Sequence, residues 1–173
     1  AIPRVVPPLQ QRVGVDLASF PPAEGGQATA AAFDALMAGG APPAPISGNY
    51  PASASLVVVD RDGMAVSCAF TMNNLFGTGR VVPGTGVLLA AAPGIGQVVP
   101  PPLAAGLVHN ANQRVFRAAS AGSGQAMAPL AAAIPLAGMM RGRDAASALS
   151  GIPEPGRGVA INCPRYLPGA VEL

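Results

Sequence analysis

Residues 53–66 read Ser-Ala-Ser-Leu-Val-Val-Val-Asp-Arg-Asp-Gly-Met-Ala-Val, and this stretch decides the predicted fold. Residues 53–59 are rich in β-branched side chains and predict a strand. Residues 60–63 have turn chemistry, because Gly63 tolerates a positive φ. Residues 64–72 then predict the returning strand, so the stretch as a whole predicts an antiparallel hairpin.

The chain around this hairpin alternates short apolar runs with turn signals. A second hairpin is predicted where two apolar runs flank the polar stretch 110–113. Pro135 is expected to kink or end the helix that contains it. The remaining elements are predicted from periodicity and from Gly and Pro signals: helices over 27–38, 125–140 and 143–150, and strands over 87–92, 103–109, 114–120 and 158–162.

The distribution of prolines and glycines predicts three segments. Residues 1–26 are expected to form an irregular, Pro-rich extended arm that ends at Gly25–Gly26. Residues 27–52 are expected to hold a short helix and a stiff Pro-rich linker. Residues 53–173 are expected to form the main domain. Strands in the middle with helices on either side predict an α+β fold, with a mainly antiparallel sheet and flanking helices.

The composition points to a surface that is covered in the native state. Half of the 173 residues are apolar and 10% are charged, against about 25% charged in an ordinary domain. Partner subunits or a membrane surface are the expected cover. A GC-rich genome, which favours Ala, Gly, Pro and Arg, is the alternative explanation, and all ten basic residues are indeed Arg.

Several functions are excluded or disfavoured by what the sequence contains. There is no Arg-rich run with interleaved aromatic residues, so nucleic-acid binding has little support. Apolar runs have the length of strands, so no transmembrane segment is predicted. Cys68, Cys163 and the single His109 lack the spacing of a metal site, and no cofactor is expected. A Cys68–Cys163 disulfide and two buried thiols remain open alternatives. Ala1 in place of a Met suggests the removal of a signal peptide.

Three stretches carry a resemblance to a known family. Residues 53–66, residues 71–79 (Thr-Met-Asn-Asn-Leu-Phe-Gly-Thr-Gly) and residues 83–89 (Pro-Gly-Thr-Gly-Val-Leu-Leu) occur in the order seen in the small subunit of γ-glutamyltranspeptidases. The Ser-Ala-Gly-Ser-Gly at 120–124 resembles the Gly pair of that family more weakly. The chain therefore resembles a degenerate and truncated γ-glutamyltranspeptidase small subunit.

The resemblance implies the fold and chemistry of an N-terminal-nucleophile hydrolase. Such an enzyme cuts its own chain, and the freed residue attacks an amide carbonyl with its α-amine as the base. The nucleophile position falls on Ser53, and Thr71 matches a residue that hydrogen-bonds near it. Asn73 matches a substrate-binding Asn. Gly122 and Ser123 match the two amides that stabilise the oxyanion. The family works in the periplasm or at the cell surface.

The departures from the family pattern concern the residues that hold glutamate. Residues 90–94 (Ala-Ala-Ala-Pro-Gly) stand where the family carries acids, and no acidic residue occurs between Asp62 and Asp144. The Ser pair that holds the substrate carboxylate appears as Ala104–Ala105. The Arg that binds this carboxylate belongs to the large subunit. In the unbroken chain Ser53 also has no free α-amine.

These observations favour a non-catalytic accessory or structural subunit of a larger bacterial assembly, periplasmic or membrane-associated on the periplasmic side. One alternative is a γ-glutamyl or other amide hydrolase or transferase that uses Ser53 after self-cleavage. Another is a small-ligand-binding module around Thr71 and Asn73. Each candidate residue also has a structural interpretation: Ser53 as a strand start, Thr71 and Asn73 as an inherited polar pair, Gly122 and Ser123 as a tight strand-to-helix turn.

Overall fold

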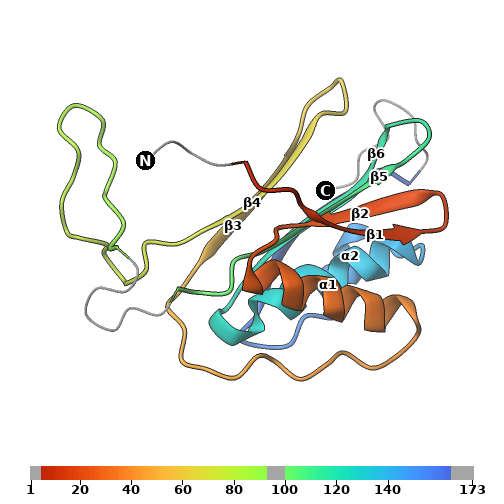
Figure 1. The fold of residues 1–173 in the computed structure, drawn as a ribbon, viewed down its shortest axis with the longest axis horizontal. Coiled ribbons are helices and arrows are strands. Elements are labelled where there is room, and N and C mark those ends of the chain that lie inside the picture. The colour runs from red at the N-terminus through yellow and green to blue at the C-terminus, as the bar shows by residue number, and fades with distance from the viewer. Residues whose placement is uncertain (1–4, 93–99, 165–173) are drawn as a thin grey trace.

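An antiparallel five-stranded sheet, here called the large sheet, forms the centre of the molecule (Figure 1). The structure is a computed structural model that describes residues 5–92 and 100–164. The large sheet has the strand order β1-β2-β5-β6-β7, and every neighbouring pair is antiparallel. Its strands are β1 (Leu9–Val13), β2 (Asp16–Phe20), β5 (Ala104–Asn110), β6 (Phe116–Ser123) and β7 (Arg157–Asn162).

The N-terminal region differs from the predicted irregular arm. Residues 9–20 form the β1–β2 hairpin, which turns at Gly14 with φ 60° and pairs with β5. The arm prediction was wrong here because the prolines flank the two strands without interrupting them. Pairing with β5, which lies more than 80 residues away, is invisible to local patterns. Residues 1–4 lie outside the described residues.

Helices cover one face of the large sheet (Figure 1). They are α1 (Glu24–Met37), a 3₁₀ turn η1 (Gln125–Met127), α2 (Ala128–Met140) and α3 (Ala145–Leu149). The core between helices and sheet contains Phe20 and Phe33, whose rings lie 5.5 Å apart, together with the fully buried Leu136. Aromatic rings at this separation and tilt attract each other, and this attraction adds to the stabilisation from their burial.

Two details of the helices correct the sequence prediction. Gly25 and Gly26 do not end the preceding segment but form the buried first turn of α1. A Cβ on Gly26 would lie 1.9 Å from the carbonyl oxygen of Pro21, so only glycine permits this close approach. Pro135 does not end α2, which continues to Met140. α2 is buried over most of its length, and tertiary packing outweighs the hydrogen bond that proline removes.

A second, smaller sheet packs on the opposite face of the large sheet. It consists of β3 (Ala54–Val59) and β4 (Ala65–Phe70), which confirms the hairpin predicted from residues 53–72. Val57, Val59 and Ala65 pack against residues of β5, β6 and β7. Ser67 Oγ donates a hydrogen bond of 2.7 Å to the carbonyl oxygen of Ser120. The molecule is therefore layered as helices, large sheet and small sheet, and the predicted α+β class is confirmed.

The outer face of the small sheet is exposed to solvent. This face is formed by alternate residues of the two strands: Leu56, Val58, Val66, Cys68 and Phe70. Cys68 is exposed with a free thiol, so it forms no disulfide with the buried Cys163. Apart from Cys68, the outward side chains of this face are aliphatic or aromatic, so the face lacks the polar residues that a solvated face usually carries.

Residues 71–92 form a long loop that extends away from the rest of the molecule, at the left of Figure 1. The buried strand predicted over 87–92 is wrong, because among the described residues this stretch forms an isolated bridge between Val81 and Leu88 and no continuous strand. Val87 is 57% exposed and Leu89 44% exposed. An apolar run becomes a strand only where a neighbour pairs with it, and no described strand lies beside this one.

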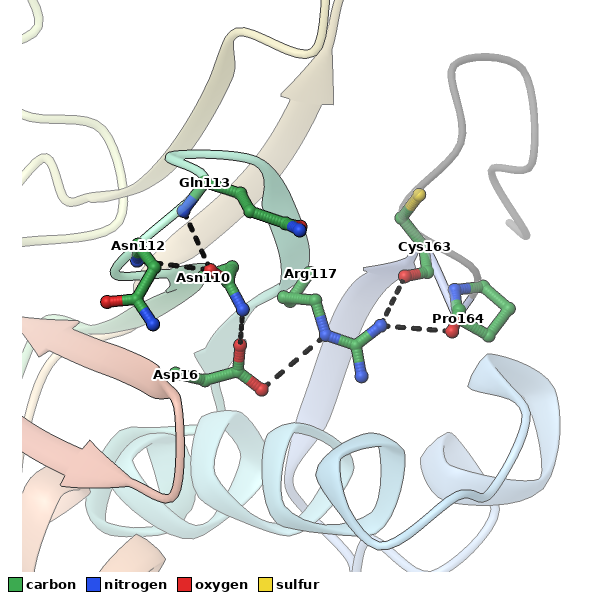
Figure 2. Close-up of polar contacts among 7 residues, drawn as sticks. All are labelled: Asp16, Asn110, Asn112, Gln113, Arg117, Cys163 and Pro164. Atoms are coloured by element: carbon green, nitrogen blue, oxygen red, sulfur yellow. Dashed lines mark hydrogen bonds and ion pairs between the residues drawn. The ribbon is translucent and has the colours of Figure 1, made fainter.

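A buried chain of polar contacts ties four neighbouring strands of the large sheet together (Figure 2). Asp16 on β2 lies 3.5 Å from the Nε of Arg117 on β6, and the two side chains are 7% and 17% exposed. Asn110 at the end of β5 donates to Asp16 Oδ1 at 3.4 Å. Arg117 Nη1 donates to the carbonyl oxygens of Cys163 and Pro164, just after β7. Both charges thus have partners, as burial requires.

We predict that Arg117→Leu lowers the free energy of unfolding by about 3 kcal/mol, because it leaves the Asp16 carboxylate buried without its cation. Urea denaturation measures this change. Arg61→Leu is the matched control, since the Arg61–Asp62 pair is 94% and 79% exposed and exposed pairs contribute little. Equal effects of the two substitutions would contradict the role given to Arg117.

Candidate functional site

The ends of the β3–β4 hairpin bring Ser53 and Thr71 together. Ser53 directly precedes β3 and Thr71 directly follows β4, and the register pairs Ala54 with Phe70. Thr71 Oγ1 donates a hydrogen bond of 2.8 Å to the carbonyl oxygen of Ala52. This carbonyl belongs to the peptide bond that joins Ala52 to Ser53. The Thr71 hydroxyl therefore donates to the peptide bond that self-cleavage before Ser53 would break.

The hydroxyl of Ser53 is buried without a hydrogen-bond partner among the residues that the structure describes. A buried hydroxyl in this state keeps the cost of its lost hydration, about 1–3 kcal/mol. The hydroxyl oxygen is also not tied to the fold by any hydrogen bond. Such a group is either a local defect of the packing or an oxygen kept for chemistry at the neighbouring carbonyl.

Asn73 closes the base of the long loop. Its backbone N–H donates to Thr71 Oγ1 at 2.9 Å, and its side-chain amide donates to the carbonyl oxygen of Ala91 at 2.6 Å. Ala91 N–H in turn donates to Met72 O at 3.0 Å. Asn73 has a left-handed φ of 62°, which Asn adopts more readily than most residues. The side chain holds the two ends of the 71–92 loop together.

Gly122 and Ser123 lie at the end of β6, within the large sheet. Gly122 is opposite Ala104 on one side and Gly158 on the other, so it sits in the middle of the strand ladder. A Cβ at this position would lie 2.2 Å from Ala128 O, which explains the glycine by the close packing of α2. Ser123 Oγ donates to Arg157 O at 3.4 Å. No hydrogen bond among the described residues joins Gly122 or Ser123 to Ser53, so their oxyanion role stays a prediction.

Within the described residues, no hydrogen bond or ion pair joins a charged side chain to Ser53 or Thr71. His109 is on β5, opposite Leu17 of β2. Asp60 is in the β3–β4 turn, where its Oδ1 accepts from the N–H groups of Asp62 and Met64. Asp144 caps α3, and the hydrogen bonds from Ser147 hold the pKa of this carboxyl below its ordinary value. In the described part of the chain no three His, Cys, Asp or Glu side chains form a group that could hold a metal ion.

Comparison with known proteins places this site within a family-related segment. The sequence model of the gamma-glutamyltranspeptidase family matches residues 43–92. This segment contains the small sheet, Ser53, Thr71, Asn73 and the whole long loop, and the match confirms the resemblance over these residues. Gly122 and Ser123 lie outside it. The comparison with curated proteins found no match.

Two partners in this site are backbone carbonyls that the sequence motifs did not reveal. Thr71 contacts the carbonyl of Ala52, and Asn73 contacts the carbonyl of Ala91. Every residue carries such a group, so no residue type marks the ones that are used. The local signal is limited to the hydroxyl of Thr71, two positions before the N–H of Asn73, which is the spacing of a hydroxyl-closed turn.

We predict opposite effects of removing the two hydroxyls of the site. Ser53→Ala is expected to leave the free energy of unfolding unchanged or to raise it by about 1 kcal/mol, because it removes a buried, unbonded hydroxyl. Thr71→Val removes a hydroxyl that donates to Ala52 O and accepts from the N–H of Asn73. It is expected to lower the free energy of unfolding by about 1–3 kcal/mol. Urea denaturation of both variants gives the comparison. A clear loss of stability in Ser53→Ala would mean that its Oγ is bonded.

Proposed function

We propose that this chain is a non-catalytic accessory subunit of a larger protein assembly, built on a γ-glutamyltranspeptidase-related fold. The observation that carries the proposal is the exposed outer face of the small sheet. Val58 is 55% exposed, Val66 54% and Phe70 47%. An apolar sheet face that stays in contact with water is a typical sign of a surface that a partner covers.

The long loop, which follows β4 in the sequence, exposes further apolar side chains. Leu75 is 76% exposed and Phe76 is 68% exposed. Between Gly63 and Ala92 the only charged residue is Arg80. The centre of a protein interface is depleted in charge and enriched in aromatic and large aliphatic residues, and this segment has that composition.

The proposed lack of catalysis rests on the lack of groups that would bind glutamate. No acidic residue occurs from residue 63 to residue 143 that could hold a substrate ammonium. Ala104 and Ala105, at the position of the family's Ser pair, are buried in the large sheet and offer no hydroxyl. The amide of Asn73 already holds Ala91 O. A cleft that has lost its charged contacts has little left with which to bind glutamate.

We further propose that the assembly lies in the bacterial periplasm, free or on the periplasmic side of a membrane. The location comes from the family resemblance, and the low charge of the chain is compatible with a membrane surface as part of the cover. Among the described helices, none has the length and apolar character needed to cross a membrane.

The sharpest test of the accessory role uses two valines of equal exposure. Val58 on the outer face is 55% exposed, and Val15 in the β1–β2 turn is 54% exposed. The chain purified under mild conditions is expected to have a mass well above its own 17.0 kDa by light scattering. Val58→Lys is expected to weaken the association at least about tenfold, because it buries a charge in an apolar contact. Val15→Lys is expected to have no effect, and a stable soluble monomer of the unsubstituted chain would contradict the proposal.

A second candidate function is a serine-type amide hydrolase or transferase, favoured by the contact between Thr71 Oγ1 and Ala52 O. In self-cleavage, Ser53 Oγ would attack the Ala52 carbonyl carbon, and its proton would pass to the amide nitrogen as the C–N bond breaks. Water would then hydrolyse the resulting ester, which leaves a carboxylate on Ala52 and a free α-amine on Ser53. Thr71 is placed to polarise the attacked carbonyl.

Intact mass separates the two functions. The accessory role predicts an unbroken chain and no release of product from a γ-glutamyl anilide. The hydrolase predicts a fragment that begins at Ser53, turnover of the anilide, and loss of both in Ser53→Ala. Because Ser53→Ala is expected to fold, absence of cleavage in this variant reports on chemistry and not on stability.

A further inference from the structure

The strand β4 has a free edge on the side away from β3. Asp60 N–H donates to Met64 O, which fixes the pattern of the hairpin. Even-numbered residues of β4 therefore exchange hydrogen bonds with β3, and the backbone groups of Ala65, Ser67 and Ala69 point to the opposite side. Within residues 5–92 and 100–164, no backbone hydrogen bond is made to this edge.

A groove of about 390 Å³ runs beside this edge. β4 packs over β5 and β6, and β3 packs over β6 and β7, so among the described residues the small sheet covers the β5–β7 part of the large sheet. The groove lies at the border of this covered part, over β2 and β5. Residues 65–67 of β4 form one wall, and its floor includes Ser19 of β2 together with Ala105 and Leu107 of β5.

The lining of the groove suits an extended, uncharged chain. Every residue that lines it is uncharged. Its far wall contains Pro8, Pro21 and Pro22, which have no N–H and cannot pair with the carbonyls of the β4 edge. The edge itself has no Lys, Pro, bulge or inward charge of the kind that protects free edges in native sheets. In the part of the chain that the structure describes, the hydrogen-bonding groups of this edge thus stay open beside the groove.

From these features we infer that the groove receives an extended strand of a partner protein, which pairs with the free edge of β4. The strand extends the small sheet by main-chain hydrogen bonds to Ala65, Ser67 and Ala69. Alternate side chains of this strand point down to Ser19, Ala105 and Leu107, so small uncharged residues fit there. The inference rests on the proposed function, because it gives the binding mode of the partner in the assembly.

A second copy of this chain does not fit the same place. Two β4 edges could pair only if both small sheets were coplanar. The β1–β2 region of each molecule extends beyond its own β4 edge, and both regions would then occupy the same space beneath the joined sheets. A single strand has no such layer attached to it, and this difference favours a slender segment of a different protein.

The test uses a fluorescein-labelled hexapeptide of alternating threonine and valine, with fluorescence polarisation on the full chain. Main-chain pairing gives most of the affinity in this binding mode, so a generic strand serves as the probe. Ser67→Pro removes one outward N–H and is expected to weaken binding about tenfold. Ser55→Pro is the matched control: it removes an outward N–H from β3, on the opposite edge of the hairpin, and is expected to bind like the unsubstituted chain.

A second variant guards against a folding defect in Ser67→Pro. Ser19→Arg fills the floor of the groove without touching β4 and is expected to abolish binding, while Val15→Arg is its surface control. The same peptide with N-methylated backbone is expected not to bind. Failure of the unmodified peptide to bind at about 1 mM, or equal binding by Ser19→Arg, would overturn the inference. Intact mass on the same samples reports separately on the proposed function, since cleavage at Ser53 would contradict that function alone.

Discussion

The buried ion pair of Asp16 and Arg117 is the constraint on which the arrangement of the large sheet depends. A buried carboxylate and a buried guanidinium must stay paired, because each would otherwise be an uncompensated charge. Their separation of 3.5 Å therefore fixes where β2 lies relative to β6. Asn110 and the carbonyl of Cys163 extend this constraint to β5 and to the end of β7. The N-terminal hairpin is thereby joined to strands that are about 100 residues further along the chain.

The large sheet is a platform with two unequal faces. Helices rich in alanine cover one face so closely that Gly122 admits no Cβ. Among the described residues, the small sheet covers the β5–β7 part of the other face, and its own outer face and the edge of β4 stay open. Open apolar surface of this kind supports association as the proposed function. It also agrees with the scarcity of charge between residues 63 and 92, where Arg80 is the one charged residue.

Local patterns predicted those elements whose neighbours are close in sequence. The β3–β4 and β5–β6 hairpins follow from turn chemistry at Gly63 and Asn110, and the helix around Phe33 follows from its periodicity. The strand expected at 87–92 does not form because hydrophobicity alone supplies no partner. The β1–β2 hairpin was missed because flanking prolines look the same whether they border a strand or interrupt a coil.

The sequence by itself determined the class of fold, the family resemblance of residues 53–89 and the lack of acidic side chains between Asp62 and Asp144. These are properties of residue type and order, which local chemistry reads directly. Only the tertiary structure decided that Thr71 bonds Ala52 O and, within residues 5–92 and 100–164, that Ser53 Oγ is buried without a bond and that β4 has an open edge beside a groove. Backbone groups are the same in every residue, so which of them are paired depends on how distant strands meet.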